Sequence, residues 1–173
     1  MLVSAVTFAD LVLAVHILGV IVGFGVTFAY PVFFGVGARM EPSAMPWFFR
    51  MVQLLTRRLV YPGLLIVLVC GIYLASKEDQ FHAFYAQWGF FAVIAIGAIE
   101  GGVMAPRVRT LITVSARDLA AAPAAPALAH SRPSASSFSA DYRAAFRQLS
   151  VAGAVQSGIV VLTVFFMAAH IGA

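Results

Sequence analysis

The stretch FADLVLAVHILGVIVGFGVTFAY, residues 8–30, decides the fold of this chain. Between Asp10 at its start and Tyr30 at its end, it holds one readily titratable side chain, His16. A hydrocarbon core about 30 Å thick needs about 20 apolar residues per helical span. Three further stretches have this character, at residues 59–75, 87–105 and 149–171. Together they predict an all-α fold, a four-span transmembrane helical bundle.

The composition also indicates a membrane protein. Hydrophobic residues make up 62% of the 173 residues and charged residues 10%, with a mean hydropathy of +0.95. Soluble domains usually carry about 25% charged residues. Since unpaired backbone groups are costly in lipid, the spans must be helices. We predict one integral membrane domain over residues 1–173, with a flexible cytoplasmic loop at about 115–140, whose centre is rich in Ala, Pro and Ser.

The basic residues predict a topology. Four arginines lie between the first and second spans and six between the third and fourth, whereas Lys77 alone lies between the second and third. Cytoplasmic loops of membrane proteins carry an excess of Lys and Arg. We therefore expect both basic loops in the cytoplasm and both termini on the outer side. The net charge of +4 then reflects topology and contact with the lipid bilayer, and no aromatic-basic motif points to nucleic acid.

Several enzyme and metal motifs are missing from the sequence. It has no HExxH, Walker A or GxSxG motif, and no cluster of carboxylates that would hold a divalent ion. Cys70 is the only cysteine and lies inside the second span, so no intrachain disulfide can form. These observations favour a non-enzymatic protein without a metal site, whose buried polar residues serve packing or partner binding.

Polar and small residues share faces of the predicted helices. From His16, steps of about 3.6 residues lead to Gly19, Gly23, Thr27 and Tyr30 on one side of the first helix. Polar residues in a membrane bundle face other helices and not lipid. The same spacing argument covers the third and fourth spans. The buried polar candidates are Thr27, Tyr30, Glu100, Gln156 and Thr163.

Two of these polar positions have more than one interpretation. His16 is a neutral imidazole bonded to a neighbouring helix, a proton relay, or a ligand of haem b or copper, with His170 and Met167 of the fourth span as candidate co-ligands. Glu100 either pairs with a basic residue near the membrane boundary or forms a proton or substrate site. The candidate basic partners of Glu100 are Arg57, Arg58 and Arg107.

Close-approach motifs occur in two spans, as Gly19-xxx-Gly23 and Gly97-xxx-Gly101. Such glycine pairs let helix backbones approach each other in a membrane. They serve packing within one chain, or they form the interface of a homodimer or of a complex with another membrane protein.

Spans one and two carry a recognisable pattern, AVHILGVIVGFGVTFAYPVFF followed by RRLVYPGLLIVLVCGIYL. It resembles the bacterial predicted integral membrane proteins grouped as domain of unknown function 2269. More distantly, it is similar to the four-helix HemJ-type protoporphyrinogen oxidases and the copper-resistance D proteins. The features that match are His16, Tyr30-Pro31 and Pro62-Gly63.

The resemblance implies a location in the bacterial inner membrane. In the oxidase-like relatives, a histidine such as His16 is implicated in haem binding together with a lysine in span three. This sequence has Glu100 in that span and no lysine. The resemblance therefore adds two alternatives to the non-enzymatic interpretation: a haem-binding redox protein or oxidase-like enzyme, and a copper-handling membrane protein.

Overall fold

The computed structural model describes residues 6–121 and 138–169, and every regular element in those ranges is a helix. The all-α prediction is confirmed, and four helices are long and apolar enough to cross a membrane. The elements in chain order are α1 (Phe8–Gly37), η1 (Pro42–Ala44), α2 (Met45–Leu55), η2 (Thr56–Val60), α3 (Tyr61–Lys77), α4 (Phe84–Ile99), η3 (Glu100–Met104), α5 (Ala105–Ala121) and α6 (Ala140–Ala168).

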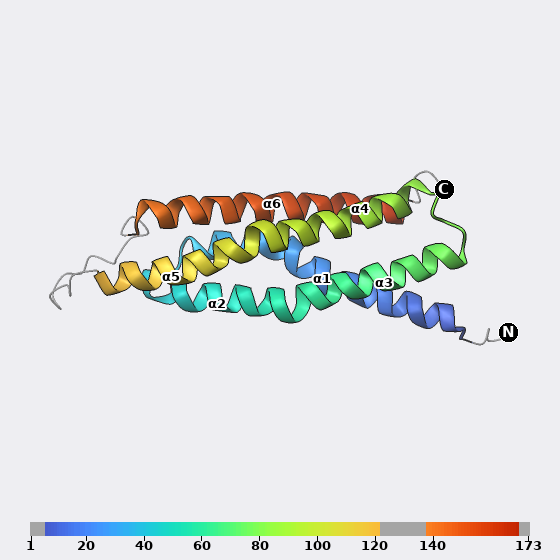
Figure 1. The fold of residues 1–173 in the computed structure, drawn as a ribbon, viewed down its shortest axis with the longest axis horizontal. Helices are drawn as coiled ribbons and strands as arrows, with labels where there is room; N and C mark the ends of the chain where they lie inside the picture. Colours follow the sequence, from blue (N-terminus) through green and yellow to red (C-terminus); the bar gives the residue numbers. More distant parts are fainter. Residues whose placement is uncertain (1–5, 122–137, 170–173) are drawn as a thin grey trace.

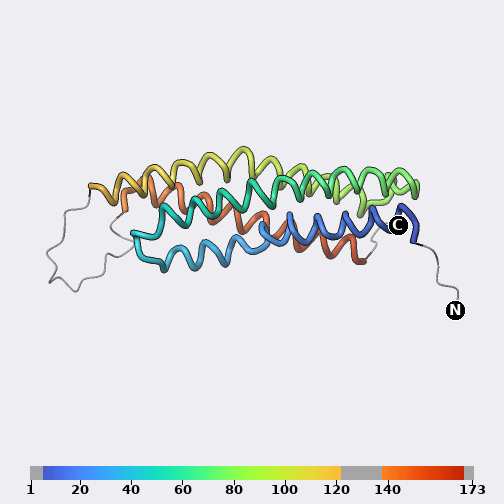
Figure 2. Tube along the Cα trace, turned by 90° about the horizontal axis from the view of Figure 1, so that it is seen from below, coloured from blue at the N-terminus to red at the C-terminus, as the bar shows by residue number. Residues whose placement is uncertain are grey.

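These elements form four long rods that lie side by side (Figure 1). α1 and α6 are rods by themselves, residues Pro42–Lys77 form the second, and residues Phe84–Ala121 form the third. α1 and α4 each pack against both α3 and α6, and α2 packs against α5. The end of the bundle that holds α2, α5 and the start of α6 carries most of the arginines, and we call it the basic end (Figures 1 and 2). Lys77 lies at the opposite end, beside the α3–α4 turn.

The prediction of a flexible loop at about 115–140 is wrong for its first part. α5 stays helical to Ala121, because Leu119 also packs on the core and Asp118 accepts a hydrogen bond from Ser139 at the start of α6. An amphipathic helix is stabilised by such packing even where its overall apolarity is low. At the other end of the predicted loop, α6 begins at Ala140, and residues 122–137 lie outside the described residues.

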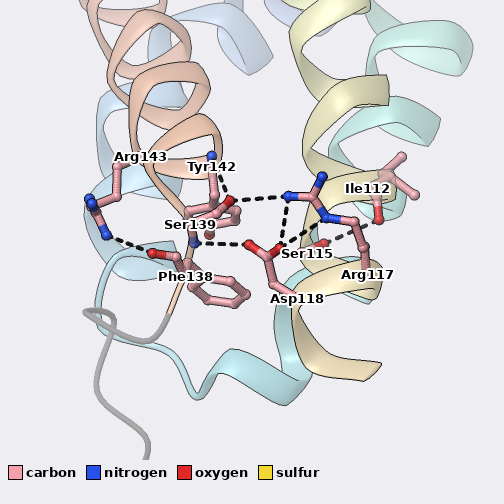
Figure 3. Close-up of polar contacts among 8 residues, drawn as sticks. All are labelled: Ile112, Ser115, Arg117, Asp118, Phe138, Ser139, Tyr142 and Arg143. Atoms are coloured by element: carbon pink, nitrogen blue, oxygen red, sulfur yellow. Dashed lines mark hydrogen bonds and ion pairs between the residues drawn. The ribbon is translucent and has the colours of Figure 1, made fainter. Parts of the chain in front are cut away.

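Polar contacts fasten α5 to the start of α6 at the basic end (Figure 3). The Ser139 hydroxyl accepts a hydrogen bond from the Tyr142 backbone N–H at 3.4 Å and so caps α6. Asp118 of α5 accepts from the Ser139 backbone N–H at 2.9 Å and pairs with Arg117 at 3.0 Å. The Arg143 guanidinium donates to the Phe138 carbonyl. The Asp118–Ser139 bond thus joins the two helices where α6 begins, and the bonds within residues 138–143 shape the first turn of α6.

The outer surface of the bundle is apolar along the spans. In the most apolar 18-residue stretch of each of the four spans, only 22–33% is buried inside the protein. Large apolar side chains such as Ile21, Leu65 and Ile94 are each more than 60% exposed. A surface of this extent must be covered by lipid or protein, since soluble proteins rarely expose contiguous apolar patches beyond a few hundred Å². The helices are thus apolar enough to sit in a lipid bilayer, and the chain is a multi-pass membrane protein by helix length and hydropathy.

Candidate functional site

Four buried polar side chains meet inside the bundle, between its two hydrophobic clusters. We call this set the central polar cluster: Tyr30 of α1, Thr56 of η2, Glu100 of η3 and Gln156 of α6. Each of the four rods therefore contributes one member. Tyr30, Glu100 and Gln156 are each 0% exposed, and Thr56 is 7% exposed.

Glu100 and Gln156 form the centre of the cluster. The Gln156 amide Nε2 donates to Glu100 Oε1 at 3.1 Å and lies 3.5 Å from the Ile96 carbonyl oxygen. Two other oxygens, Glu100 Oε2 and Gln156 Oε1, are buried without a hydrogen-bond partner. Leaving a buried polar atom unpaired costs about 1–3 kcal/mol, and more for a charged group. The centre of the bundle is therefore polar but incompletely satisfied.

Tyr30 connects this centre to Thr56. Its hydroxyl lies 3.0 Å from Thr56 Oγ1, and either group can be the donor. The side chains of Tyr30 and Glu100 are also close enough to interact. Since a phenol both donates and accepts, Tyr30 can bridge a hydroxyl and a carboxyl at the same time. The cluster is thus a chain of polar groups that runs from Gln156 to Thr56.

Both π-helical segments of the structure begin at members of this cluster. The Thr56 carbonyl accepts from the Tyr61 backbone N–H, and the Glu100 carbonyl accepts from the Ala105 backbone N–H, each five residues further along the chain. Single π turns inside α-helices are rare and frequently occur at functional sites. Their coincidence with Thr56 and Glu100 marks the cluster as a specialised part of the fold.

The prediction that Glu100 pairs with Arg57, Arg58 or Arg107 is wrong as far as the described residues extend. Within residues 6–121 and 138–169, the one salt bridge joins Arg117 to Asp118. Glu100 projects into the bundle core, whereas all three of these arginines are exposed at its surface. The carboxyl group contacts an amide and a phenol in place of a guanidinium.

Two cavities lie toward the basic end, and the smaller one touches the cluster. The larger has a volume of about 510 Å³ and mainly apolar walls near the start of α6, with Arg143 and Arg147 among its lining residues. The smaller has a volume of about 40 Å³ and is lined by Thr56 itself. Its other lining residues are Gln53, Arg57, Tyr61, Met104, Ala105, Val108 and Arg109. This small cavity joins the polar cluster to the basic surface.

His16 lies in the interface between α1 and α3, away from both of these cavities. Its ring covers Gly71, with Cε1 3.3 Å from the point that a Cβ atom on that residue would occupy. The ring also lies within reach of the Val67 backbone. Its Nδ1 atom is buried and has no hydrogen-bond partner. The Nδ1 atom of His16 is thus a candidate ligand atom that faces α3.

The candidate co-ligands of His16 are placed differently. The terminal methyl of Met167 packs onto Gly89 of α4, at the α4–α6 interface. His16 and Met167 therefore have different neighbours. His170, the remaining candidate, lies outside the described residues.

The other buried polar candidates are satisfied by hydrogen bonds outside the central polar cluster. Thr27 donates to the Phe24 carbonyl at 2.9 Å within α1. Thr163 donates to the Ile159 carbonyl at 2.7 Å and accepts from the Trp88 indole N–H at 3.1 Å. The Trp88 bond ties α4 to α6 and needs no further partner. Thr27 and Thr163 are thus packing residues.

The two glycine motifs, Gly19-xxx-Gly23 and Gly97-xxx-Gly101, differ in what surrounds them. A Cβ atom on Gly63 of α3 would lie 2.6 Å from the Gly23 Cα, and one on Gly19 would lie 2.9 Å from Ile66 Cγ2. Gly19 and Gly23 therefore serve the packing of α1 on α3. Cβ atoms on Gly97 and Gly101 would meet nothing within 4 Å.

The helix lengths and the buried polar cluster define the class: a four-helix, multi-pass membrane protein with a polar core. No family model, curated protein or solved structure matches the chain in the comparisons with known proteins.

The sequence did not predict two residues that form these hydrogen bonds, Thr56 and Trp88. Thr56 precedes Arg57 and Arg58, and this basic neighbourhood indicates a membrane boundary and not a buried position. Trp88 falls near a predicted span end, where indole rings commonly anchor at the membrane interface. A sequence signal does exist for Thr56, because it lies four residues from each of two apolar residues that are buried, Val52 and Val60.

Proposed function

We propose that this chain is a non-enzymatic, multi-pass protein of the bacterial inner membrane whose buried polar residues fix the packing of its helices or hold a partner. The observation that carries the proposal is the Glu100–Gln156 hydrogen bond, which joins the third rod to α6 at full burial. In lipid, apolar contact gives little preference for one neighbour over another, so interhelical hydrogen bonds and close packing select the arrangement.

Exchange of Gln156 for leucine tests the packing role. Gln156→Leu keeps the size of the side chain but removes the donor to Glu100 Oε1, and it should lower the free energy of unfolding by about 1–3 kcal/mol. The matched control is Val155→Leu, a neighbouring residue that is 50% exposed on the outside of α6. Reversible unfolding in mixed micelles measures both variants. Equal stability of the two would contradict the packing role.

The proposed topology places the basic end in the cytoplasm and both termini outside. It is supported by the concentration of arginines at one end of the bundle and the single Lys77 at the other. With this orientation the small cavity and Thr56 open toward the cytoplasm.

We also propose membership of the family grouped as domain of unknown function 2269. The support for this proposal is the sequence pattern of His16, Tyr30-Pro31 and Pro62-Gly63. Tyr30 belongs to the central polar cluster, and Gly63 forms the close crossing with Gly23.

A haem-binding protein is the second candidate, favoured by the buried and unpartnered Nδ1 atom of His16. An imidazole nitrogen is a common axial ligand of haem, which would supply redox chemistry when bound, but here Nδ1 faces α3 beside Gly71 and neither of the two cavities reaches it. The absorption spectrum of protein purified from haem-replete cells tests the candidate: a Soret band that is lost in His16→Ala would establish it. A colourless folded protein would exclude haem binding, and metal analysis of the same sample tests copper.

A further inference from the structure

We propose that Glu100 is a reversible proton-binding site, which exchanges its proton with the basic end of the bundle through the hydroxyls of Tyr30 and Thr56. This goes beyond a packing role, because it assigns the central polar cluster a ligand, the proton, and a route by which that ligand enters. Four observations carry the proposal: the unpartnered oxygens, the lack of a cation, the small cavity and the apolar barrier on the opposite side.

The unpartnered oxygens leave a place for one more proton at the centre of the cluster. Glu100 Oε2 and Gln156 Oε1 are both buried acceptors without a partner, on two side chains that are already joined by a hydrogen bond. An ionised carboxylate is an acceptor only, whereas a protonated one also donates. A single proton on Oε2 therefore turns one of the two acceptors into a donor and removes the charge.

No cation compensates a negative charge at this position in the described part of the chain. Moving an unpaired carboxylate into a medium of low dielectric is so unfavourable that the group binds a proton instead. The Gln156 amide and the Tyr30 phenol can stabilise either state of the carboxyl, because they donate to a carboxylate and accept from an acid. Such surroundings suit a group that both takes up and releases a proton.

The ionisable groups around the cluster come from several elements. Tyr30 faces it from α1 and Tyr61 from the start of α3, while Arg57 of η2 and Arg109 of α5 line the small cavity. α6 presents Gln156, which does not ionise. The two arginines place positive charge beside the small cavity.

The small cavity provides the entrance. Its volume of about 40 Å³ exceeds the roughly 10–15 Å³ that one water molecule requires, and its walls include polar side chains. Thr56 lines this cavity and also lies 3.0 Å from the Tyr30 hydroxyl. A hydronium ion in the cavity can give a proton to Thr56 as Thr56 gives its own to Tyr30 and Tyr30 gives its own to the Glu100 carboxylate. The hydronium ion becomes water, each hydroxyl ends neutral, and the carboxylate becomes a carboxylic acid.

The route has one open side. Beyond the cluster, toward the α3–α4 turn, the core is the hydrophobic cluster of Phe24, Val60, Leu64, Val67, Val93, Ile96 and Val160. None of these side chains can donate or accept a proton, and the buried hydroxyls in this half, Thr27 and Thr163, donate to carbonyls of their own helices. The π turns at Thr56 and Glu100 lie on the boundary between this barrier and the polar route. Glu100 is thus at the inner end of a path that begins at the basic end.

Infrared spectroscopy of the protein in lipid nanodiscs tests the proton site directly. At neutral pH the wild-type spectrum should contain a carboxylic acid C=O band, which Glu100→Gln removes and the matched control Glu78→Gln keeps. Raising the pH should convert this band reversibly into carboxylate absorption. A wild-type protein without the band, or a band that persists in Glu100→Gln, would overturn the proposal. Loss of the band on adding Na⁺ at constant pH would also overturn it, in favour of a metal cation.

Hydrogen–deuterium exchange of the same band tests the route. Tyr30→Phe and Thr56→Val should each slow the exchange by about tenfold, which corresponds to about 1.4 kcal/mol on the barrier. The controls are Tyr142→Phe, at a buried tyrosine outside the cluster, and Thr113→Val, at an exposed threonine on α5. Unchanged exchange in both test variants would overturn the route.

The unfolding free energies of these variants separate the two proposals. A packing role without a proton site would lower stability in Gln156→Leu and show no acid band in the wild type. A proton site without a packing role would show the band while Gln156→Leu keeps its stability. Circular dichroism and size-exclusion chromatography confirm that each variant is folded before its spectrum is interpreted.

Discussion

Replacing Gly63 with alanine should force α1 and α3 apart, because the new Cβ atom would meet backbone and not a flexible side chain. That atom would lie 2.6 Å from the Gly23 Cα and 2.7 Å from the Gly23 nitrogen. Carbon atoms pack best at about 3.5–4.0 Å, so the two helices must separate locally by about 1 Å. Overpacking of this kind typically costs about 1–3 kcal/mol.

Gly25→Ala is the matched comparison for this cost. A Cβ atom on Gly25 of α1 would meet nothing within 4 Å. Both glycines lie inside helices, so both exchanges bring the same gain in helix propensity, about 1 kcal/mol. The difference between the two variants therefore isolates the steric term, and we expect Gly63→Ala to be less stable than Gly25→Ala by about 1–3 kcal/mol.

Reversible unfolding in mixed detergent micelles, followed by circular dichroism, measures this difference. Gly101→Ala provides a second reference, because its Cβ atom would also meet nothing within 4 Å. If Gly63→Ala differed from both references by less than about 0.5 kcal/mol, below the usual cost of overpacking, the inferred crossing of α1 and α3 would be refuted.

Three further predictions concern the ends and interfaces of the bundle. Trp88→Phe should cost about 0.5–1.5 kcal/mol by removing the indole donor to Thr163, and a double-mutant cycle with Thr163→Val should show their coupling. Ser139→Ala should cost about 0.5–2 kcal/mol and speed amide exchange in the first turn of α6, because it removes the cap. In a cysteine-free background, an impermeant maleimide applied from outside should label Glu78→Cys but not Arg117→Cys; the reverse pattern would invert the topology.

The spans could be predicted from the sequence because a membrane core imposes a length and a composition that few other constraints imitate. The points at which the helices end could not be predicted in the same way. α5 continues to Ala121 since its buried face packs on α2 and α6, and a hydropathy pattern contains no information about which neighbour is available. Loop composition dominates the prediction of residues 115–121, whereas tertiary packing decides their structure.

The members of the polar cluster were largely accessible to sequence reasoning, but their contacts were not. Helical spacing places Tyr30 and Gln156 on inward faces, and an uncharged neighbourhood makes Glu100 conspicuous. The spacing of residues along one helix specifies only the direction in which each side chain points around the axis of that helix. It does not determine that Glu100 meets Gln156, 56 residues away, in preference to an arginine only a turn or two distant.

The spacing of buried residues contains a signal for both π segments. The second rod buries four side chains that are spaced four residues apart: Val52, Thr56, Val60 and Leu64. The third rod repeats this pattern with Ile96, Glu100, Met104 and Val108.

At about 100° per residue, each interval of four overshoots a full turn by about 40°, so three intervals would rotate the last residue by about 120° away from the first. A regular α-helix could not keep all four on one buried face. A wider turn, with its hydrogen bond five residues long, absorbs the excess, and in each rod it starts at the second residue of the series. That second residue is Thr56 in one rod and Glu100 in the other. The register that keeps both rods in the core thus also places these two polar groups at the ends of the proposed proton route.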